Sequence, residues 1–345
     1  MSKIRSRIRN KFPLLVCLVS LSGFSSAASA QWQALPDKAP APADNPTTAA
    51  KIELGRSLFF DPRLSSTGTV SCNSCHNVML GGEDNRPVAM GVHGKTGGRS
   101  APTVWNAAFN SSQFWDGRAR SLEEQALGPI TNPIEMGLKN LTVAINRLRA
   151  IKGYTPMFEK AFGGKNAITI ENLAKAIAAY ERSLITPNSP YDRYVKGDKS
   201  ALTAQQVKGM KHFAELGCTG CHSGPAFSGP AMAPGTGFFM KFPTYTDNEY
   251  VKKYDLMADK GRADKHEWKV PTLRNIALTA PYFHNGKVDT LEEAVRVMAR
   301  TQLNKKLTHA QVEELVAFLN ALSGEFPTQP MPRLPTTEGW TFIRK

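Results

Sequence analysis

The feature that most constrains this chain is a five-residue pattern that occurs twice, as CNSCH at 72–76 and as CTGCH at 218–222. Apart from Cys17, these two motifs hold every cysteine of the 345-residue sequence. Two thiols at this spacing reach the two vinyl groups on one edge of a porphyrin, and the next histidine faces the iron. The pattern therefore predicts two covalently bound c-type haems, with proximal iron ligands at His76 and His222 and thioether bonds at Cys72, Cys75, Cys218 and Cys221.

Four cysteines also suggest a disulfide framework, a zinc site or a redox-active CxxC pair. A zinc site would have to gather the pairs at Cys72 and Cys218, which are 146 positions apart in the sequence. A redox pair has no need of the histidine that follows each motif. The repeated histidine therefore favours haem attachment over these alternatives.

The first 30 residues have the pattern of a secretory signal peptide. Five basic residues within positions 3–11 precede a short apolar run at 12–21 and the small residues at 28–30. We expect cleavage after Ala30 and export to the periplasm, because the apolar run is too short to span a bilayer. Removing the five basic residues lowers the net charge from +14 to +9. The remaining charges are scattered, which favours a solvated basic surface over nucleic-acid binding.

The chain repeats itself beyond the cysteine motifs. Residues 101–126 align without a gap on residues 270–295, and nine of the 26 positions are identical. Such self-similarity predicts an internal duplication. We expect a mainly α protein of two cytochrome c-like domains, each with one covalently bound c-type haem. The first domain would comprise residues 31–185, and the second, after a boundary near Thr186, residues 186–345 with a Pro-rich tail.

Local patterns indicate where helices and loops lie. Thr203 and Thr308 each stand three residues before a glutamine, as in the capping box that begins a helix. The stretch ITIENLAKAIAAYERSL has the periodicity of an amphipathic helix, and the linker ITPNSPYDRY follows it. Gly- and Pro-rich stretches at 81–102 and 223–246 predict loops that fold over the haems. The tail after Phe326 is expected to lie along the surface.

One position of the repeat changes in a way that bears on haem chemistry. Met298 carries the thioether that, opposite histidine, closes the iron of high-potential cytochromes c. Its counterpart 169 positions earlier is Pro129, which has no lone pair to offer iron. We therefore expect a closed, electron-transferring haem in the second domain and an open haem in the first. The alternative is that Met298 only fills a gap in the core.

Two polar residues near Pro129 suit chemistry on peroxide at an open iron. Glu135, in the loop sequence NPIEMG, offers a carboxylate that moves a proton between the two oxygens. Gln125, which aligns with Ala294 in the other half, offers an amide that hydrogen-bonds peroxide or water. A surface charge is the simpler explanation for a glutamate in a loop. The position of Glu135 beside the missing ligand is what favours a catalytic role.

Together these features resemble the bacterial dihaem cytochrome c peroxidase family. The resemblance runs from Leu54 to Leu322 and includes LFFDPRLS, SCNSCHN, FWDGRA, LRNIAL, PYFHNGKV and LVAFLNAL. It implies a low-potential peroxidatic haem in the N-terminal domain and a high-potential haem held by His222 and Met298 in the C-terminal domain. It also implies that Glu135 is the catalytic acid/base and that Gln125 is the distal glutamine.

The same resemblance implies roles for two further residues. Trp115 matches the tryptophan that carries electrons between the haems, although packing at the domain interface is an alternative role. His93 matches the histidine that closes the peroxidatic iron in the oxidised resting form and leaves when the other haem is reduced. Glycines at 91, 94, 97 and 98 suit such a moving loop. A solvated histidine is the alternative, and some members of the family are active without this step.

The family also binds one calcium ion between its domains. Thr279 and Pro281 match two of its ligands, which offer backbone oxygens as suits calcium. Ser100 stands where the family has asparagine, a departure that bears on the affinity for the ion. The resemblance further implies a homodimer.

We thus expect a periplasmic enzyme that reduces H2O2 to water with electrons from a small cytochrome c or a cupredoxin. One alternative is a dihaem enzyme that oxidises residues of a partner protein, but such enzymes carry tyrosine where this chain has Met298. The other is a non-catalytic electron carrier. Pro129 and Glu135 argue against it, because a carrier has no use for an open iron with an acid beside it.

Overall fold

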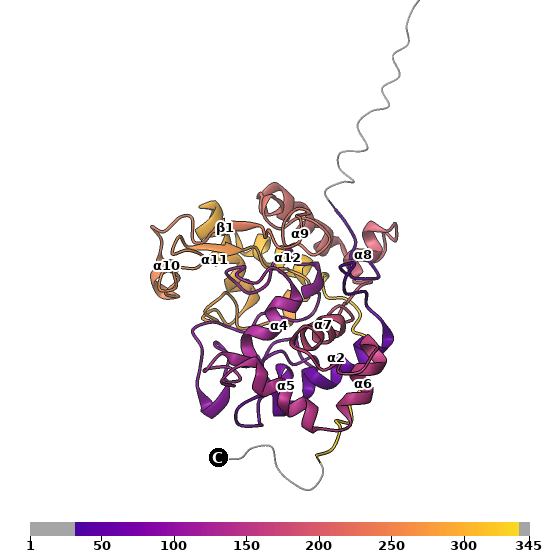
Figure 1. Ribbon diagram of the computed structural model, residues 1–345. Coiled ribbons are helices and arrows are strands. Elements are labelled where there is room, and N and C mark those ends of the chain that lie inside the picture. The colour runs from indigo at the N-terminus through magenta and orange to yellow at the C-terminus, as the bar shows by residue number, and fades with distance from the viewer. Residues whose placement is uncertain (1–31, 338–345) are drawn as a thin grey trace, which may run out of the picture.

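The computed structural model describes residues 32–337, so the predicted signal peptide lies outside the described residues. This part of the chain is mainly helical, as expected, with one antiparallel pair of short strands (Figure 1). Within the described range, no helix combines the length and apolar character needed to cross a membrane. The elements are α2 Ala49–Phe60, α3 Cys72–Cys75, α4 Leu122–Thr131, α5 Leu141–Ala150, α6 Tyr154–Phe162, α7 Ile170–Glu181, α8 Pro190–Val195, α9 Ala204–Glu215, β1 Phe239–Lys241, α10 Glu249–Lys253, β2 Glu267–Lys269, α11 Leu291–Leu303 and α12 His309–Asn320.

The helices begin where their capping residues predict. Thr203 and Thr308 form the expected capping boxes at the starts of α9 and α12. The predicted amphipathic helix is α7, where the Thr169 side chain accepts a hydrogen bond from the N–H of Asn172. A side-chain oxygen at this position satisfies a backbone donor that has no partner inside the helix. The apolar face of α7 is buried, as its periodicity predicts.

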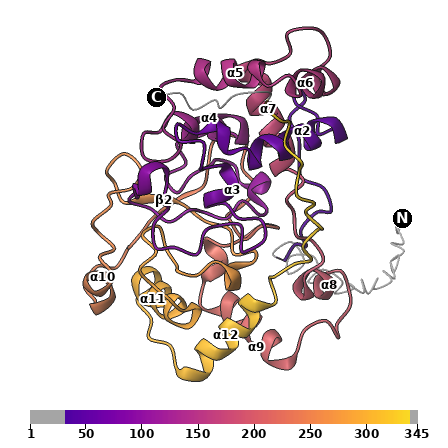
Figure 2. The same ribbon diagram turned by 90° about the horizontal axis from the view of Figure 1, so that it is seen from below.

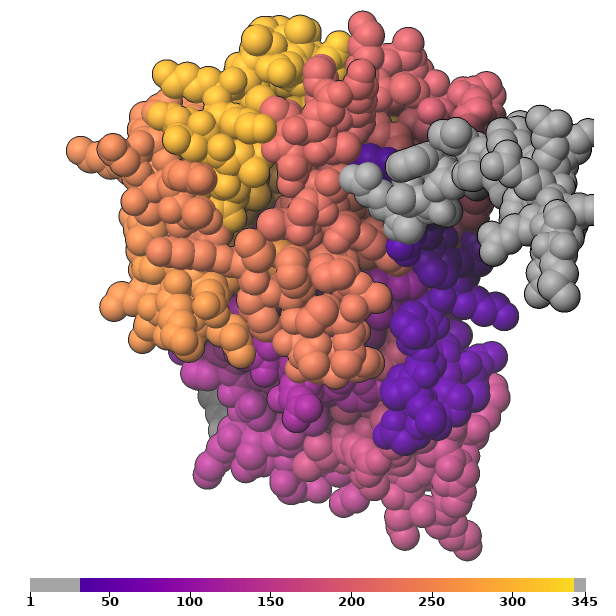
Figure 3. Space-filling view, turned by 90° about the horizontal axis from the view of Figure 1, so that it is seen from above, coloured from indigo at the N-terminus to yellow at the C-terminus, as the bar shows by residue number. Residues whose placement is uncertain are grey.

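Two hydrophobic cores organise these helices, one within residues 54–184 and the other within residues 191–322. The first is built on the packing of α2 against α7, and the second on that of α9 against α12. A glycine permits each close approach. A Cβ on Gly55 would lie 1.9 Å from the carbonyl oxygen of Ala176, and one on Gly209 would lie 1.8 Å from that of Glu314. The two halves pack against each other in one continuous body (Figure 3).

The two halves adopt the same local conformations 169 positions apart. The 3-10 turn Ala107–Phe109 recurs as Ile276–Leu278. The asparagine before each turn has a left-handed backbone, with φ of 62° at Asn106 and 59° at Asn275. Helices α4 and α11 also begin at equivalent positions, so that residues 129 and 298 occupy the same place on corresponding helices.

The structure differs from the sequence-based expectation in the linker and in one loop. Helix α8 forms inside the expected linker because Ser189 and Asp192 build a capping box and Pro190 fills the first helical position. Strand β1 forms inside the stretch expected as a loop at 223–246, where it pairs with β2. That pairing joins segments far apart in the chain, so a local pattern carries no sign of it.

The Pro-rich tail lies along the surface, as expected, and returns to the first half of the molecule (Figure 2). Its Phe326 ring contacts Trp105 edge-on, with the ring centroids 4.8 Å apart. Further along, the carbonyl oxygen of Pro335 accepts a hydrogen bond of 2.8 Å from Nη1 of Arg63. The last described stretch of the chain therefore helps to cover the first core.

Candidate active site

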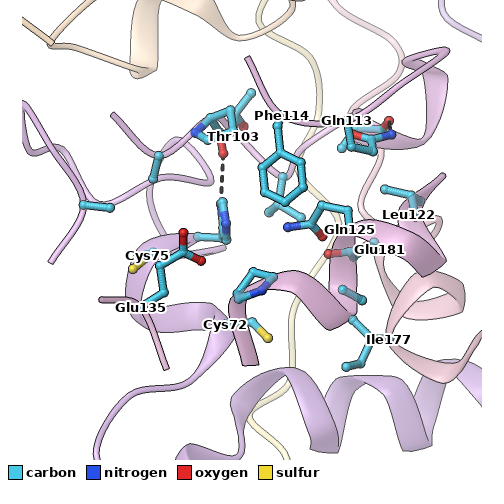
Figure 4. Close-up of a pocket in the computed structure, with 18 of the residues that line it drawn as sticks. Cys72, Cys75, Thr103, Gln113, Phe114, Leu122, Gln125, Glu135, Ile177 and Glu181 are labelled. Carbon is cyan, nitrogen blue, oxygen red and sulfur yellow. Dashed lines mark hydrogen bonds between the residues drawn. The ribbon is translucent and has the colours of Figure 1, made fainter. Parts of the chain in front are cut away.

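The first cysteine motif lines a cavity in the first half of the chain. Cys72 and Cys75 lie on the single helical turn α3 and His76 follows it, and all three line a space of about 1080 Å³ that includes its mouth (Figure 4). Nδ1 of His76 lies 2.9 Å from the carbonyl oxygen of Pro102. A ring nitrogen that donates to a carbonyl leaves the other one, Nε2, with a lone pair for a metal.

These groups fit a covalently attached haem. The described cysteines are free thiols, and burial raises the pKa of the Cys75 thiol to about 12. Burial also lowers the pKa of His76, which keeps its imidazole neutral. A neutral imidazole can ligate iron, and two neighbouring thiols at the edge of a largely apolar cavity can bond the porphyrin.

The second motif repeats this arrangement in the other half. His222 is buried, and its Nδ1 lies 2.9 Å from the carbonyl oxygen of Phe227. Cys218 packs against the second core, whereas Cys72 packs against the first. No group of three or more His, Cys, Asp or Glu side chains suited to a metal ion occurs among residues 32–337. The two cysteine pairs therefore do not meet in a shared zinc site.

The residues expected to act on peroxide meet at the first cavity. Gln125 and Pro129 come from α4, and Glu135 comes from the loop after it. Asn132 Nδ2 donates a hydrogen bond of 3.0 Å to Glu135 Oε1. Burial raises the pKa of Glu135, and the positive charge of Arg118 partly offsets that rise. A carboxyl group with a raised pKa is better suited to exchanging protons near neutral pH than an ordinary surface glutamate.

A second hollow of about 590 Å³ adjoins this cavity. The two spaces share four lining residues, namely Phe114, Arg118, Pro129 and Glu135. The Arg118 guanidinium lies over the Phe114 ring, 3.5 Å from its centroid. Glu135 thus lies where the two spaces adjoin.

Trp115 connects this cavity to the second half of the molecule. It lines the cavity and also packs against the second core. Its Nε1 donates a hydrogen bond of 2.9 Å to the carbonyl oxygen of Ser100, and its own carbonyl oxygen accepts one of 2.9 Å from the N–H of Lys269. The ring of His284 lies edge-on, with centroids 6.5 Å apart. The indole is thus held in one orientation between the two halves.

His93 does not line the cavity. It is exposed in the turn Val92–Gly94, and its backbone has a left-handed φ of 58°. The turn is nevertheless tied to the site, because the N–H of Val92 donates a hydrogen bond of 2.9 Å to the carbonyl oxygen of Glu135. The structure therefore has the cavity free of the His93 side chain.

Met298 lies on α11, is partly buried and packs against the second core.

The segment with the expected calcium ligands lies at the junction of the halves. The N–H of Ser100 donates a hydrogen bond of 2.8 Å to the carbonyl oxygen of His284, close in sequence to Thr279 and Pro281.

Two buried acids near these sites escaped the sequence-based reasoning. Glu181, at the end of α7, lines the first cavity. Glu83 is 2% exposed, and its Oε1 has no hydrogen-bond partner among the described residues. Burial raises the pKa of Glu83 to about 7, and its charge acts on Tyr282, next to the expected calcium ligand Pro281. Their side chains are buried because segments far apart in the sequence pack together. No local sequence motif predicts such packing.

Comparison with known proteins identifies the family. A family model described as di-haem cytochrome c peroxidase matches residues 49–200. The cytochrome c551 peroxidase of Pseudomonas aeruginosa is 43% identical over 322 residues, which cover 93% of this chain and 92% of that protein. The chain belongs to the di-haem cytochrome c peroxidase family. This confirms the resemblance read from the sequence.

Other members of this di-haem family extend the likeness. The cytochrome c551 peroxidase of Nitrosomonas europaea is 42% identical over 332 residues, covering 96% of this chain and 97% of that protein. The methylamine utilization protein MauG of Methylorubrum extorquens is 34% identical over 311 residues, covering 87% of this chain and 86% of that protein. A solved MauG-like protein associated with microbial copper homeostasis superimposes with a TM-score of 0.71 at 30% identity, covering 84% of this chain and 95% of that one.

Proposed function

We propose that this protein is a periplasmic cytochrome c peroxidase that reduces H2O2 to two waters with two electrons and two protons. The observation that carries the proposal is the first cavity, where Gln125 and Glu135 face the space next to His76 and Pro129 stands where the other half has Met298. The relatives named as cytochrome c551 peroxidases support the same activity.

In this proposal Cys72, Cys75 and His76 hold the peroxidatic haem. When bound, the haem supplies the redox-active iron at which peroxide is reduced. The Glu135 carboxylate would accept a proton from one peroxide oxygen and return it to the other, so that this second oxygen can leave as water when the O–O bond breaks. Gln125 donates a hydrogen bond that orients the peroxide. H2O2 would enter through the second hollow, which Arg118 also lines.

The second half would act as the electron entry point. Cys218, Cys221 and His222 would hold a haem there, and the Met298 thioether would be available as a further ligand to its iron. A small cytochrome c or a cupredoxin donates the electrons, which pass Trp115 on their way to the first cavity. The indole suits this role because its bond to Ser100 and its contact with the second core fix its position.

The two halves are proposed to be duplicated haem domains, with residues 31–185 forming the peroxidatic domain and residues 186–345 the electron-transfer domain. The recurring turns, the left-handed asparagines and the paired close-packed glycines support this division. Removal of a signal peptide after Ala30, periplasmic location and a homodimeric state complete the proposal.

One calcium ion is proposed at the junction, held by backbone oxygens of Thr279 and Pro281 and by Ser100. Glu83 fits the vicinity of such a cation, because its buried Oε1 lacks a partner and an oxygen-rich site suits calcium. In the resting oxidised form His93 would close the peroxidatic iron and leave after the other haem is reduced. The bond between Val92 and Glu135 would couple that movement to the catalytic loop.

The test is steady-state H2O2 turnover by the holoenzyme with a reduced small cytochrome c, starting from fully oxidised and from half-reduced protein. Turnover only after half-reduction supports the peroxidase and the His93 switch, whereas turnover in both states keeps the peroxidase and removes the switch. If neither state turns over although both haems are present, the peroxidase proposal is wrong, and oxidation of a partner protein or simple electron carriage takes its place.

A further inference from the structure

Glu181 is a second carboxyl group in the first cavity, separate from Glu135. It ends α7, is 5% exposed and lines the same space, yet its Oε2 has no hydrogen-bond partner among the described residues. Figure 4 shows Glu181 beside Gln125, across the cavity from Glu135. A buried polar atom without a partner costs free energy, so its retention in a cavity wall calls for a reason.

Arg182 and Glu123, whose charges act on Glu181, belong to a row of polar groups that reaches the surface. Nη2 of the neighbouring Arg182 donates a hydrogen bond of 2.7 Å to Glu123 Oε1, while its buried Nη1 has no partner in the described part of the chain. The same Glu123 oxygen accepts a bond of 2.8 Å from Asn45 Nδ2, and Asn45 Oδ1 accepts one of 3.0 Å from Lys51 Nζ. The Glu123 side chain is 18% exposed, so the row reaches solvent there.

The two unpartnered atoms mark the inner end of this row. Oε2 of Glu181 and Nη1 of Arg182 belong to consecutive residues, and both are suited to hydrogen-bonding an internal water molecule. Burial raises the pKa of Glu181 to about 8, and the nearby charge of Arg182 limits that rise. Glu181 therefore carries a proton at neutral pH and can release it without a large cost.

The proposed reaction needs such a group. Each H2O2 takes up two electrons and two protons to give two waters, but a proton that Glu135 moves from one oxygen to the other adds none. Both protons must therefore come from outside the reacting atoms. We propose that Glu181 delivers them to the first cavity and is reprotonated from solvent through water held beside Arg182 and Glu123. This inference rests on the proposed peroxidase function of that cavity.

Few charged groups act on the Glu181 carboxyl group, so its proton remains available for transfer. The groups whose charges act on it are Arg182, directly after the end of α7, and Glu123 on α4. On α3 the neighbour is the Cys72 sulfur, which carries no charge once bonded to haem. Several other ionisable groups on the packed helices have partners of their own. Arg56 lies over the Tyr180 ring, Arg147 and Arg149 donate to backbone carbonyls, Lys160 pairs with Glu53, Lys175 pairs with Glu171 and Asp44, and the Tyr154 hydroxyl donates to Asp61.

The test compares holoenzyme carrying Glu181→Gln with wild type and with Glu171→Gln, an exposed position on the same helix. Glutamine has the shape of the protonated acid, so haem content and thermal stability should match wild type. The first readout is the reduction midpoint of the N-terminal haem against pH. Below a pH of about 8 Glu181 already holds its proton, and reduction of the haem raises its pKa further. We therefore expect the wild type and Glu171→Gln to take up a proton on reduction as the pH rises above about 8, and Glu181→Gln to lose that pH dependence.

The second readout is peroxide turnover. We expect Glu181→Gln to lower kcat at saturating H2O2 by about 100-fold or more, as is typical of a lost proton-transfer group, with KM unchanged and a larger solvent deuterium isotope effect. If the variant keeps both the pH dependence of the midpoint and the wild-type kcat, the proton route is overturned while the peroxidase stands. If the wild type itself does not turn over H2O2, the proposed function fails instead.

Discussion

The side-chain amides of Asn106 and Asn275 donate to one and the same acceptor, Oγ1 of Thr186, over 2.8 Å and 2.9 Å. The two asparagines are 169 positions apart, each precedes the corresponding turn of its half, and all three residues are fully buried. The junction between the halves is therefore closed by a symmetric pair of bonds to a single hydroxyl.

This arrangement predicts that Thr186→Val destabilises the protein. Valine keeps the shape but removes the acceptor, which leaves two buried amide donors without a partner at a cost of about 1–3 kcal/mol each. Urea unfolding of the holoenzyme measures the change, and Thr155→Val, at an exposed position on α6, serves as the control. Equal stability of Thr186→Val and wild type would mean that the asparagines find other partners.

The turn that carries His93 packs against the loop that carries Glu135. We therefore predict that a single added methyl group at this contact lowers peroxide turnover. A Cβ on Gly91 would lie 2.0 Å from the Ile134 carbonyl oxygen, whereas one on Gly98 meets nothing within 4 Å. Gly91→Ala must therefore push the loops apart and shift Glu135. Because a displacement of about 1 Å at a reacting group costs about 100-fold in rate, we expect a loss of that order in kcat/KM.

The measurement is steady-state turnover of half-reduced Gly91→Ala and Gly98→Ala holoenzymes. Gly98→Ala should stay within about twofold of wild type, as is usual for exposed positions without contacts. A similar loss in both variants would point to general loop damage rather than to the contact at Glu135.

The haem-attachment residues and the residues expected to act on peroxide could be predicted from the sequence, because each set lies within one short segment. The spacing in CNSCH names Cys72, Cys75 and His76, and Gln125, Pro129 and Glu135 lie on one helix and the loop after it, so adjacency in sequence becomes adjacency in space. Their convergence on one cavity follows from that arrangement.

Glu181 was beyond such reasoning. It lies 56 positions after Gln125 and reaches the same cavity because α7 packs against α4. Within its own segment it looks like the charged end of an amphipathic helix. The pairing of β1 with β2 was hidden for the same reason, since two three-residue strands carry almost no periodicity of their own. In both cases long-range packing, rather than local preference, decides the outcome.

The equivalence of residues 129 and 298 predicts that one substitution closes the peroxidatic haem. Pro129→Met puts a thioether at the position that Met298 holds in the other half, where it can ligate iron. The variant should bind haem normally and lose nearly all peroxide turnover. Its fold should not suffer, because proline inside a helix is about 3 kcal/mol less favourable than alanine, whereas methionine is a good helix former.

Pro129→Ala is the matched control, since alanine relieves the helix without offering a ligand. Optical and magnetic spectra of the N-terminal haem in the two variants report the ligation directly. Six-coordinate low-spin iron in half-reduced Pro129→Met, together with an open iron and retained turnover in Pro129→Ala, is the expected result. Retained turnover in Pro129→Met would mean that residue 129 does not face the iron.

The raised pKa of Glu135 predicts how activity depends on pH. As the base that accepts the peroxide proton, Glu135 must be ionised, so activity should fall as pH drops through its pKa. Burial favours the neutral form and moves that pKa upward from the ordinary glutamate value of about 4.3. The acid limb of kcat/KM should therefore lie at higher pH than an exposed glutamate would give. Glu135→Gln should remove the limb and lower kcat/KM by about 100- to 10,000-fold.

The measurement is kcat/KM for H2O2 against pH in wild type, Glu135→Gln and Glu313→Gln, the last at a solvent-exposed position on α12. Glu313→Gln should keep the wild-type profile. If the acid limb persists in the residual activity of Glu135→Gln, another group sets it, and Glu181 would not be a candidate. Glu181 acts in its protonated form, so loss of its proton would lower activity at high pH rather than at low pH. The pH profile of kcat/KM thus distinguishes the two acids, because Glu135 sets its acid limb and Glu181 its alkaline limb.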